Sequence, residues 1–176
     1  MQTGLFQHAA ESNRYAVLVI GCGNLLRGDD GAGPECVRLL AEAGLPAGVT
    51  ALDAGTSGVD VVLSIRQASR VILIDCCRSG RPPGSLVGLS AAELAAIPGG
   101  GALDIHAFRW IDAVRLTLAL TGAGPAAAIS AWLIEGAEFA PGSGLSPAVA
   151  VAVSRLAADI RASLDPAAPA AVTAGA

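Results

Sequence analysis

Three aspartates and one histidine are the residues of this chain best suited by type and spacing to bind a cation. Asp30 follows the apolar run of residues 15–20, Asp53 ends a second apolar run, and Asp75 ends a third. His106 closes a glycine-rich stretch and would bring a nitrogen donor on a flexible loop. Two carboxylates and one imidazole, with coordination positions left open, suit divalent nickel, zinc, manganese or iron.

A dinucleotide site is the main alternative for the first of these segments, which reads GCGNLLRGDDGAG over residues 21–33. The third glycine of a G-x-G-x-x-G fingerprint would fall at position 26, which is Leu26. Asp53 lies 30 residues beyond Gly23, where about 20 are expected for the acid that binds ribose. The two adjacent acids would also repel a pyrophosphate at the start of the helix. These departures disfavour nucleotide binding.

Several neighbours of the candidate ligands have other interpretations. Asp29 or Asp30 could cap the helix that follows them, and we assign Asp29 a capping or supporting role. Thr56, in the turn after the second strand, could orient a substrate backbone. Cys76 adjoins Asp75, and a neighbouring carboxylate would raise the pKa of its thiol, which disfavours a thiolate nucleophile. The four cysteines form no CxxC pair, and we expect them to be buried and reduced.

Composition excludes several classes of protein. The chain has 176 residues, 53% of them hydrophobic and 15% charged, which suits one folded domain. Its net charge is −4 and its eleven basic residues, all arginine, form no cluster, so nucleic acid is not an expected partner. Residues 116–134 carry no charge, but a glycine-proline turn interrupts them, so we expect two buried elements and no membrane span.

Strands and helices are expected to alternate along the chain. Apolar runs predict strands at 15–20, 48–53, 70–77, 85–90 and 126–135, and helical spacing or caps predict helices near 34–43, 57–68, 90–96, 107–121 and 147–164. The last helix should be capped by Ser146. This order predicts a three-layer α/β/α domain with a mainly parallel twisted sheet. Sites in such sheets lie at the carboxyl ends of the strands, where the three aspartates are expected.

The segment VIGCGNLLRGDDGAG resembles the opening motif of the hydrogenase maturation proteases, G-x-G-N-x-[LI]-x-x-D-[DE]-x-x-G. The resemblance continues through LDAGTSGVDVVLSI, ASRVILIDCCRSGRPPGSL and GLSPAV, in that order, and covers about residues 15–165. It implies an N-terminal extension over 1–14, one protease domain of phosphorylase/hydrolase-like fold over 15–165, and a disordered tail over 166–176.

The resemblance also implies the site and the reaction. The family's metal-binding positions match Asp30, Asp75 and His106, which would then be both the metal ligands and the catalytic residues. The expected function is a nickel-dependent endopeptidase, related in type to aspartyl peptidases, that removes the C-terminal extension of a [NiFe] hydrogenase large-subunit precursor. Nickel would arrive with the precursor and would not be held tightly by the free protein. A cytoplasmic monomer is expected.

Two departures from the family pattern fall in the histidine loop, which usually reads H-x-x-G-[LIV]. Here Arg109 replaces the glycine and Trp110 the aliphatic residue. The second acid is Asp30, where many relatives have the longer glutamate. A non-catalytic nickel-binding maturation chaperone with the same three ligands, or a Rossmann-type oxidoreductase, are the alternative functions.

Overall fold

The computed structural model describes residues 14–97, 109–121 and 129–164. The expected N-terminal extension, apart from residue 14, and the expected C-terminal tail lie outside these ranges, as does His106. The first strand begins at Tyr15, and the domain boundaries at residues 15 and 165 stay predictions.

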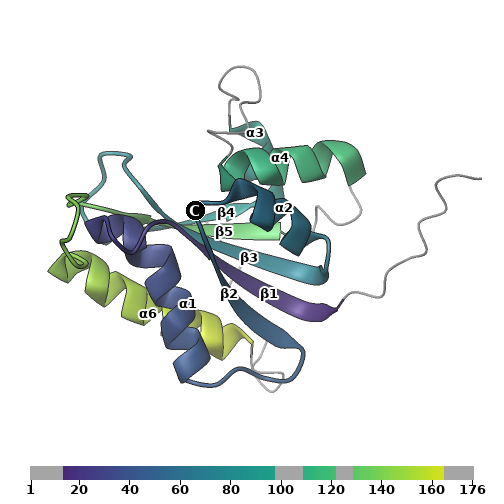
Figure 1. Ribbon diagram of the computed structural model, residues 1–176, viewed down its shortest axis with the longest axis horizontal. Coiled ribbons are helices and arrows are strands. Elements are labelled where there is room, and N and C mark those ends of the chain that lie inside the picture. The colour runs from purple at the N-terminus through teal and green to yellow at the C-terminus, as the bar shows by residue number, and fades with distance from the viewer. Residues whose placement is uncertain (1–13, 98–108, 122–128, 165–176) are drawn as a thin grey trace, which may run out of the picture.

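A five-stranded sheet with the order β2-β1-β3-β5-β4 forms the centre of the molecule (Figure 1). The strands are β1 (Tyr15–Cys22), β2 (Val49–Gly55), β3 (Ala68–Cys77), β4 (Leu86–Ser90) and β5 (Ile129–Glu135). Neighbouring strands are parallel, except that β4 runs antiparallel to β5 at one edge. The predicted mainly parallel sheet is therefore confirmed, including the edge position of residues 85–90.

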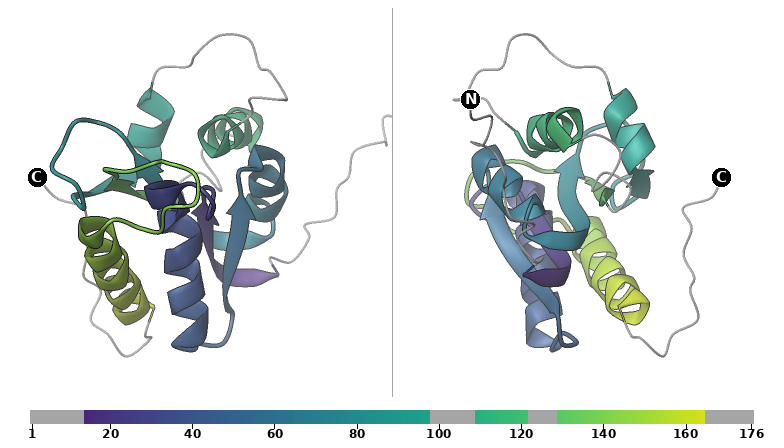
Figure 2. Two further views of the ribbon diagram at one scale, coloured as in Figure 1. Left: turned by 60° about the vertical axis from the view of Figure 1, so that its left-hand side comes forward. Right: turned by 90° about the vertical axis from the view of Figure 1, so that its right-hand side faces the viewer.

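Helices cover both faces of this sheet, which confirms the three-layer prediction (Figures 1 and 2). One face carries α1 (Ala32–Glu42) and α6 (Pro147–Ser163), and the other carries α2 (Gly58–Ile65), α3 (Ala91–Ala96) and α4 (Trp110–Thr121). Each face has its own buried apolar cluster, because parallel strands in the centre of a sheet bury both sides. Within the part of the chain that the structure describes, no helix is long and apolar enough to span a membrane.

Local sequence explains where several helices begin and end. Ser90 and Glu93 form a reciprocal capping box at the start of α3, as predicted. The side chain of Ser57 accepts a hydrogen bond from the backbone of Asp60 and caps α2. Gly44, with φ of 76°, follows the end of α1 in the left-handed conformation that glycine tolerates.

Close packing of α1 against the sheet depends on Gly33, the last glycine of the opening motif. A Cβ atom at Gly33 would lie 2.3 Å from the carbonyl oxygen of Cys22 and 2.5 Å from that of Ile74. Only a residue without a side chain allows the helix to approach β1 and β3 this closely. The turn between β1 and α1, with the two acids, is consequently held against the carboxyl ends of these strands.

Asp29 does not cap the helix that follows it, so this part of the prediction is wrong. The N-cap of α1 is Gly31, and no side chain bonds to the helix there. The Asp29 carboxylate is fully buried and accepts hydrogen bonds from the backbone of Ala137, Glu138 and Ser146, at 2.7, 2.8 and 2.6 Å. Burial alone would raise the pKa of Asp29, but these hydrogen bonds outweigh it and lower the pKa.

Ser146 occupies the N-cap position of α6 as predicted, but its side chain makes a different contact. The hydroxyl donates to Asp29 at 2.9 Å and makes no capping bond to the α6 backbone. Asp29 therefore joins the β1–α1 turn to the segment that leads into α6, across 117 residues of sequence.

Candidate active site

A pocket of about 450 Å³ opens at the carboxyl ends of the central strands. Its walls come from the turns after β1 and β2, the end of β3 and the start of α4, and include Asp30, Thr56, Asp75, Cys76, Arg109 and Trp110. The predicted location of the site, and the meeting of two of its three carboxylates there, agree with the general position of sites in parallel sheets.

Asp30 is placed by a tight loop that uses the glycines and the asparagine of the opening motif. It lies in the short 3-10 helix η1 (Gly28–Gly31). Asn24 donates its backbone N–H to the carbonyl of Asp30 at 3.0 Å, and its side chain accepts from the backbone of Leu26 at 2.9 Å. A Cβ at Gly23 would lie 1.9 Å from the carbonyl oxygen of Asp30. Gly23 thus gives room for the chain to fold back on itself.

Asp75 lies near the end of β3, and each of its oxygens has a fixed donor. Oδ1 accepts from the backbone of Cys76 at 2.8 Å, and Oδ2 accepts from the indole Nε1 of Trp110. Burial raises the pKa of Asp75 to about 7, against the opposing effect of these two hydrogen bonds; the charge of Asp30 raises it and that of Arg109 lowers it. A cation in the pocket would therefore favour the ionised carboxylate.

In the sequence, Trp110 stands out only as a departure from the family pattern. In the structure it contacts Asp75, one of the predicted metal ligands, directly. The start of α4 is held by the Asp112 side chain, which accepts the backbone N–H of Arg109 at 3.1 Å. This contact sets the first turn of the helix, from which the indole reaches β3. The only sign in the sequence was an aromatic residue at an aliphatic position, and that did not reveal its partner.

Asp53 does not line the pocket, so the predicted group of three carboxylates at this edge is reduced to two. Strand β2 continues to Gly55, and the exposed Asp53 side chain accepts the backbone N–H of Gly55 at 2.8 Å. Since side chains alternate along a strand, a position at the correct edge does not determine whether a side chain faces the site.

The thiols that line the pocket are poor nucleophiles, although Cys76 and Cys77 are only half-buried, so the expectation that all four cysteines are buried is wrong for these two. Burial raises the pKa of Cys22 and Cys76 far above the usual range, and the charge of Asp75 raises both further. Burial also raises the pKa of Cys77 to about 11, together with its hydrogen bond to Glu135. A thiolate at neutral pH is disfavoured at all three positions, in agreement with the interpretation of Cys76 from sequence.

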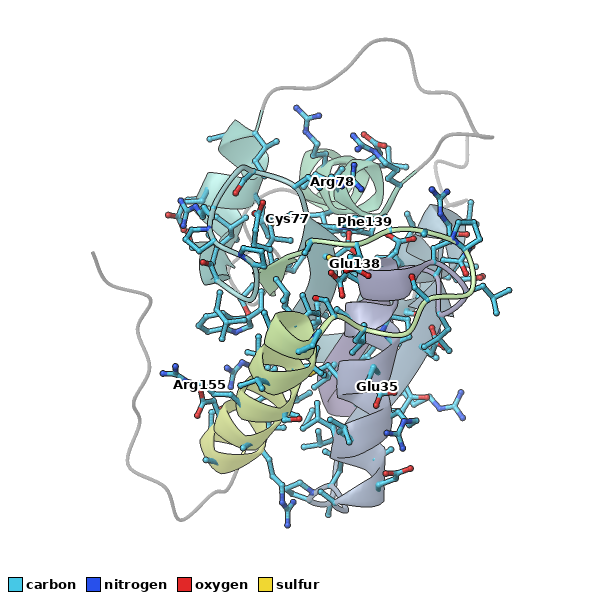
Figure 3. The ribbon with its side chains drawn as sticks, turned by 90° about the vertical axis from the view of Figure 1, so that its left-hand side faces the viewer. Glu35, Cys77, Arg78, Glu138, Phe139 and Arg155 are labelled. Atoms are coloured by element: carbon cyan, nitrogen blue, oxygen red, sulfur yellow. The ribbon has the colours of Figure 1, made fainter. Side chains whose placement is uncertain are left out.

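Glu135, at the end of β5, supports the loop that follows β3. Its buried carboxylate accepts from the Ser79 hydroxyl at 2.6 Å and from the backbone of Ser79 and Gly80, each at 2.8 Å. These contacts, the Ser79 hydroxyl foremost, lower the pKa of Glu135 to about 2. On the same loop, the Arg78 guanidinium stacks over the Phe139 ring at 3.9 Å from its centre, and the two lie together in Figure 3. Sequence reasoning did not identify this support.

His106 lies outside the described residues, so its place in the site stays a prediction. Within residues 14–97, 109–121 and 129–164, no group of three or more histidine, cysteine, aspartate or glutamate side chains is arranged to hold a metal ion. Asp30 and Asp75 would bind a cation only together with donors from elsewhere, such as the predicted His106 or groups on a partner.

The sequence matches a known protein family over most of its length. Residues 34–163 match the family model described as hydrogenase maturation protease. The hydrogenase expression/formation protein HupD of Rhodobacter capsulatus is 34% identical over 137 residues, which cover 76% of this chain and 64% of that protein. The corresponding HupM of Azotobacter chroococcum is 36% identical over 110 residues, 62% of this chain and 52% of that protein. The matches thus span between half and two thirds of these curated relatives.

The chain matches a larger share of the length of solved structures with a similar fold. The [NiFe] hydrogenase maturation protease HybD from Thermococcus kodakarensis has a TM-score of 0.68 and 27% identity, over 85% of this chain and 99% of that chain. The hydrogenase maturating endopeptidase HybD from E. coli has a TM-score of 0.67 and 25% identity, over 84% of this chain and 91% of that chain.

Proposed function

Because the chain belongs to the hydrogenase maturation protease family, we propose that it is an endopeptidase that removes the C-terminal extension of a [NiFe] hydrogenase large-subunit precursor after nickel insertion. The observation that supports this proposal most directly is that Asp30, in the turn η1 after β1, and Asp75, near the end of β3, line one pocket. These are the two acids that the motif comparison assigns to metal binding. The maturation protease HybD from Thermococcus kodakarensis and the endopeptidase HybD from E. coli have a similar fold, which supports the same assignment here.

In this proposal nickel is part of the substrate, bound by the precursor before the two proteins meet. Asp30 and Asp75 supply carboxylate oxygens to it, and the predicted His106 supplies a nitrogen; this donor set suits divalent nickel. Nickel supplies Lewis-acid chemistry next to the scissile peptide bond. The carboxylates hold the precursor in register, so that only a loaded precursor places its cleavage site in the pocket.

The fixed hydrogen bonds of Asp75 suit this task. With one donor on each oxygen, the carboxylate has little freedom to rotate, and its remaining lone pairs are available to a ligand. A ligand held in one orientation before the substrate arrives loses less entropy on binding. No thiolate nucleophile is required, in keeping with the raised thiol pKa values.

The test is to incubate the protein with nickel-loaded precursor and, separately, with nickel-free precursor, and to measure intact masses. The expected result is loss of one defined C-terminal peptide from the loaded precursor alone. Asp75→Asn and Asp30→Asn should abolish this cleavage, whereas Asp53→Asn, an exposed aspartate outside the pocket, should not. Circular dichroism should show that all three variants fold.

Different failures would point to different functions. Nickel retained or transferred without cleavage would favour the metallochaperone. Stabilisation by NADH without cleavage would favour a nucleotide-binding oxidoreductase. Full activity of Asp75→Asn would remove this pocket from the reaction.

A further inference from the structure

We propose that Arg78 is an anion-binding residue of the pocket and binds a carboxylate of the peptide chain that enters it. Arg78 directly follows β3 and lines the pocket together with Asp75, three positions earlier in the chain. Its role is to bind and orient a ligand, and it takes part in no bond-making step. The pocket itself points to a carboxylate, and only the attribution of that carboxylate to the precursor rests on the proposed function.

The guanidinium of Arg78 is held against an aromatic ring. Its central carbon lies 3.9 Å from the centre of the Phe139 ring, and Figure 3 shows the two side chains next to each other. Arginines stack on aromatic rings through the face of the guanidinium, and the N–H donors, which lie in its plane, stay free. The ring therefore fixes the position of the charge without taking the donors that would bind an anion.

The Phe139 ring is itself fixed by the backbone around it. A Cβ atom at Gly136 would lie 2.4 Å from Cζ of Phe139, so the ring packs directly on the glycine backbone. Gly136 donates its N–H to the carbonyl of Cys77 at 3.0 Å, which joins this segment to the end of β3. Just before the ring, the backbone N–H of Glu138 donates to the buried carboxylate of Asp29 at 2.8 Å. The ring is thus in place before any ligand arrives.

The backbone at Arg78 is fixed as well, because both of its neighbours donate to the carboxylate of Glu135. The thiol of Cys77 does so at 3.3 Å and the hydroxyl of Ser79 at 2.6 Å. Arg78 is therefore ordered at its backbone and at its guanidinium, although the residue is exposed. A binding group that is ordered in advance loses less entropy when its ligand binds.

The charge of Arg78 has no acidic partner within residues 14–97, 109–121 and 129–164. The ion pairs there involve Arg38, Arg109 and Arg155. Arg109 is the other arginine that lines the pocket, and its guanidinium lies 4.0 Å from the carboxylate of Asp112. Acidic residues outnumber arginines fifteen to eleven in this chain, so a shortage of acids does not explain the unpaired charge. Arg78 is thus the arginine of the pocket that is available to an external anion.

The surroundings of Arg78 favour a carboxylate over other anions. A guanidinium binds the two oxygens of a carboxylate through two parallel N–H···O hydrogen bonds. A phosphate group would bring about two negative charges toward Asp30 and Asp75, which line the same pocket, whereas a carboxylate brings one. A peptide chain offers carboxylates from two sources: those present before cleavage, on side chains or at the chain end, and the one that hydrolysis creates.

Arg70 provides a matched control for Arg78. It is also exposed, and it also has no acidic partner in the part of the chain that the structure describes. It lies near the start of β3, outside the pocket, and its guanidinium stacks on no aromatic ring of the described residues. A general tendency of exposed arginines to bind anions would therefore appear at Arg70 and Arg78 alike.

The first experiment uses acetate as the probe, since it is a carboxylate with no other recognition group. Sodium acetate is titrated into the isotope-labelled full chain at constant ionic strength, and the arginine Nε–H signals are followed by nuclear magnetic resonance. Arg78→Gln and Arg70→Gln assign the two signals. Acetate should bind at Arg78 about tenfold more tightly than at Arg70. Phe139→Leu should weaken binding at Arg78 about threefold, because the charge remains but the ring is lost.

Equal acetate affinity at Arg78 and Arg70 would overturn the proposal, and it would do so without any reference to cleavage. Acetate binding at Arg78 that Phe139→Leu leaves unchanged would overturn the role of the ring. Both arginines are exposed, so their substitution by glutamine should leave the fold intact, and circular dichroism checks this.

The second experiment tests the attribution to the precursor and distinguishes the two sources. Arg78→Gln should raise KM for nickel-loaded precursor about tenfold, with kcat unchanged, where the carboxylate is present before cleavage. It should instead raise the Kd of the trimmed large subunit about tenfold, with KM unchanged, where hydrolysis creates the carboxylate. Arg70→Gln should match the wild type in all three constants.

The remaining outcomes separate this proposal from the proposed function. Cleavage by the wild type, with KM and product Kd both unchanged in Arg78→Gln, would overturn the carboxylate site and keep the protease. Selective acetate binding at Arg78, without cleavage of loaded precursor by the wild type, would keep the carboxylate site and overturn the protease.

Discussion

The indole N–H of Trp110 donates a hydrogen bond to Oδ2 of Asp75, so the first turn of α4 orients a carboxylate at the end of β3. The two residues are 35 positions apart in sequence. With the backbone donor of Cys76 on Oδ1, this contact determines how Asp75 faces the pocket. The site is therefore formed by the turn after β1, by the end of β3 and by α4, which lies on the other face of the sheet from α1.

Trp110→Phe should reduce cleavage of nickel-loaded precursor by lowering kcat about tenfold with little change in KM. The ring and its packing remain, but the donor is lost, and a hydrogen bond to a charged group contributes about 1.5–3 kcal/mol. Trp132→Phe is the matched control, because Trp132 packs with the cluster on the α1 and α6 face. An unchanged kcat in Trp110→Phe would show that the indole does not orient Asp75.

The same contact has a readout that is independent of activity. The chain contains two tryptophans, so a proton–nitrogen spectrum has two indole N–H signals. Asp75→Ala should shift the Trp110 signal and speed its exchange with solvent, and leave that of Trp132 in place. Equal behaviour of both signals would contradict the hydrogen bond.

Asp29→Ala should lower the free energy of unfolding by about 3 kcal/mol, because three backbone N–H groups and one hydroxyl lose a buried acceptor. Urea unfolding measures the loss. Asp159→Ala removes an exposed carboxylate that lies 3.8 Å from Arg155 and should change stability by less than about 0.5 kcal/mol. Equal stability of the two variants would mean that Asp29 does not hold the segment before α6.

Glu135→Gln should remove a pH-dependent part of the stability. The pKa of Glu135 is lowered from its ordinary value of 4.5 to about 2, chiefly by the Ser79 hydroxyl, so the folded state binds its proton less tightly than the unfolded state. The resulting stabilisation is complete above pH 4.5 and is lost as the pH falls toward 2.

Urea titrations at several pH values between 3 and 7 measure this effect. The difference in unfolding free energy between wild type and Glu135→Gln should be largest at pH 7 and should shrink below pH 4.5. A difference that stays constant over this range would show that the loop after β3 does not depend on the ionised carboxylate.

Gly33→Ala should destabilise the protein by about 2 kcal/mol, although alanine normally favours a helix over glycine by about 1 kcal/mol. The added Cβ would collide with the carbonyl oxygens of Cys22 and Ile74, which are backbone atoms of the central strands. Gly144→Ala is the control, since a Cβ there meets nothing within 4 Å. Thermal unfolding of both variants distinguishes this collision from a general effect of glycine replacement.

The order of the elements and the edge of the sheet that holds the site could be predicted from sequence, because both depend on local patterns. Apolar runs, caps and glycine positions predict where β1, β3 and most helices lie, to within about three residues at each end. Parallel strands bring their carboxyl ends together. The same patterns place Asp30 in the turn after β1 and Asp75 near the end of β3, and both line the pocket. Their metal-binding role comes from the motif resemblance and stays a prediction. His106, outside the described residues, stays a prediction.

Tertiary structure alone decided which side chains meet. Asp53 has the right position along its strand but accepts a bond in its own turn, while Asp29 bonds to a segment 117 residues away. Trp110 reaches Asp75 only because α4 packs on the sheet face beside α2. Local periodicity indicates whether one segment is a helix or a strand, but not how two such elements are placed relative to each other. Hydrogen bonds form only over about 3 Å, so the sequence gives no sign of these partners.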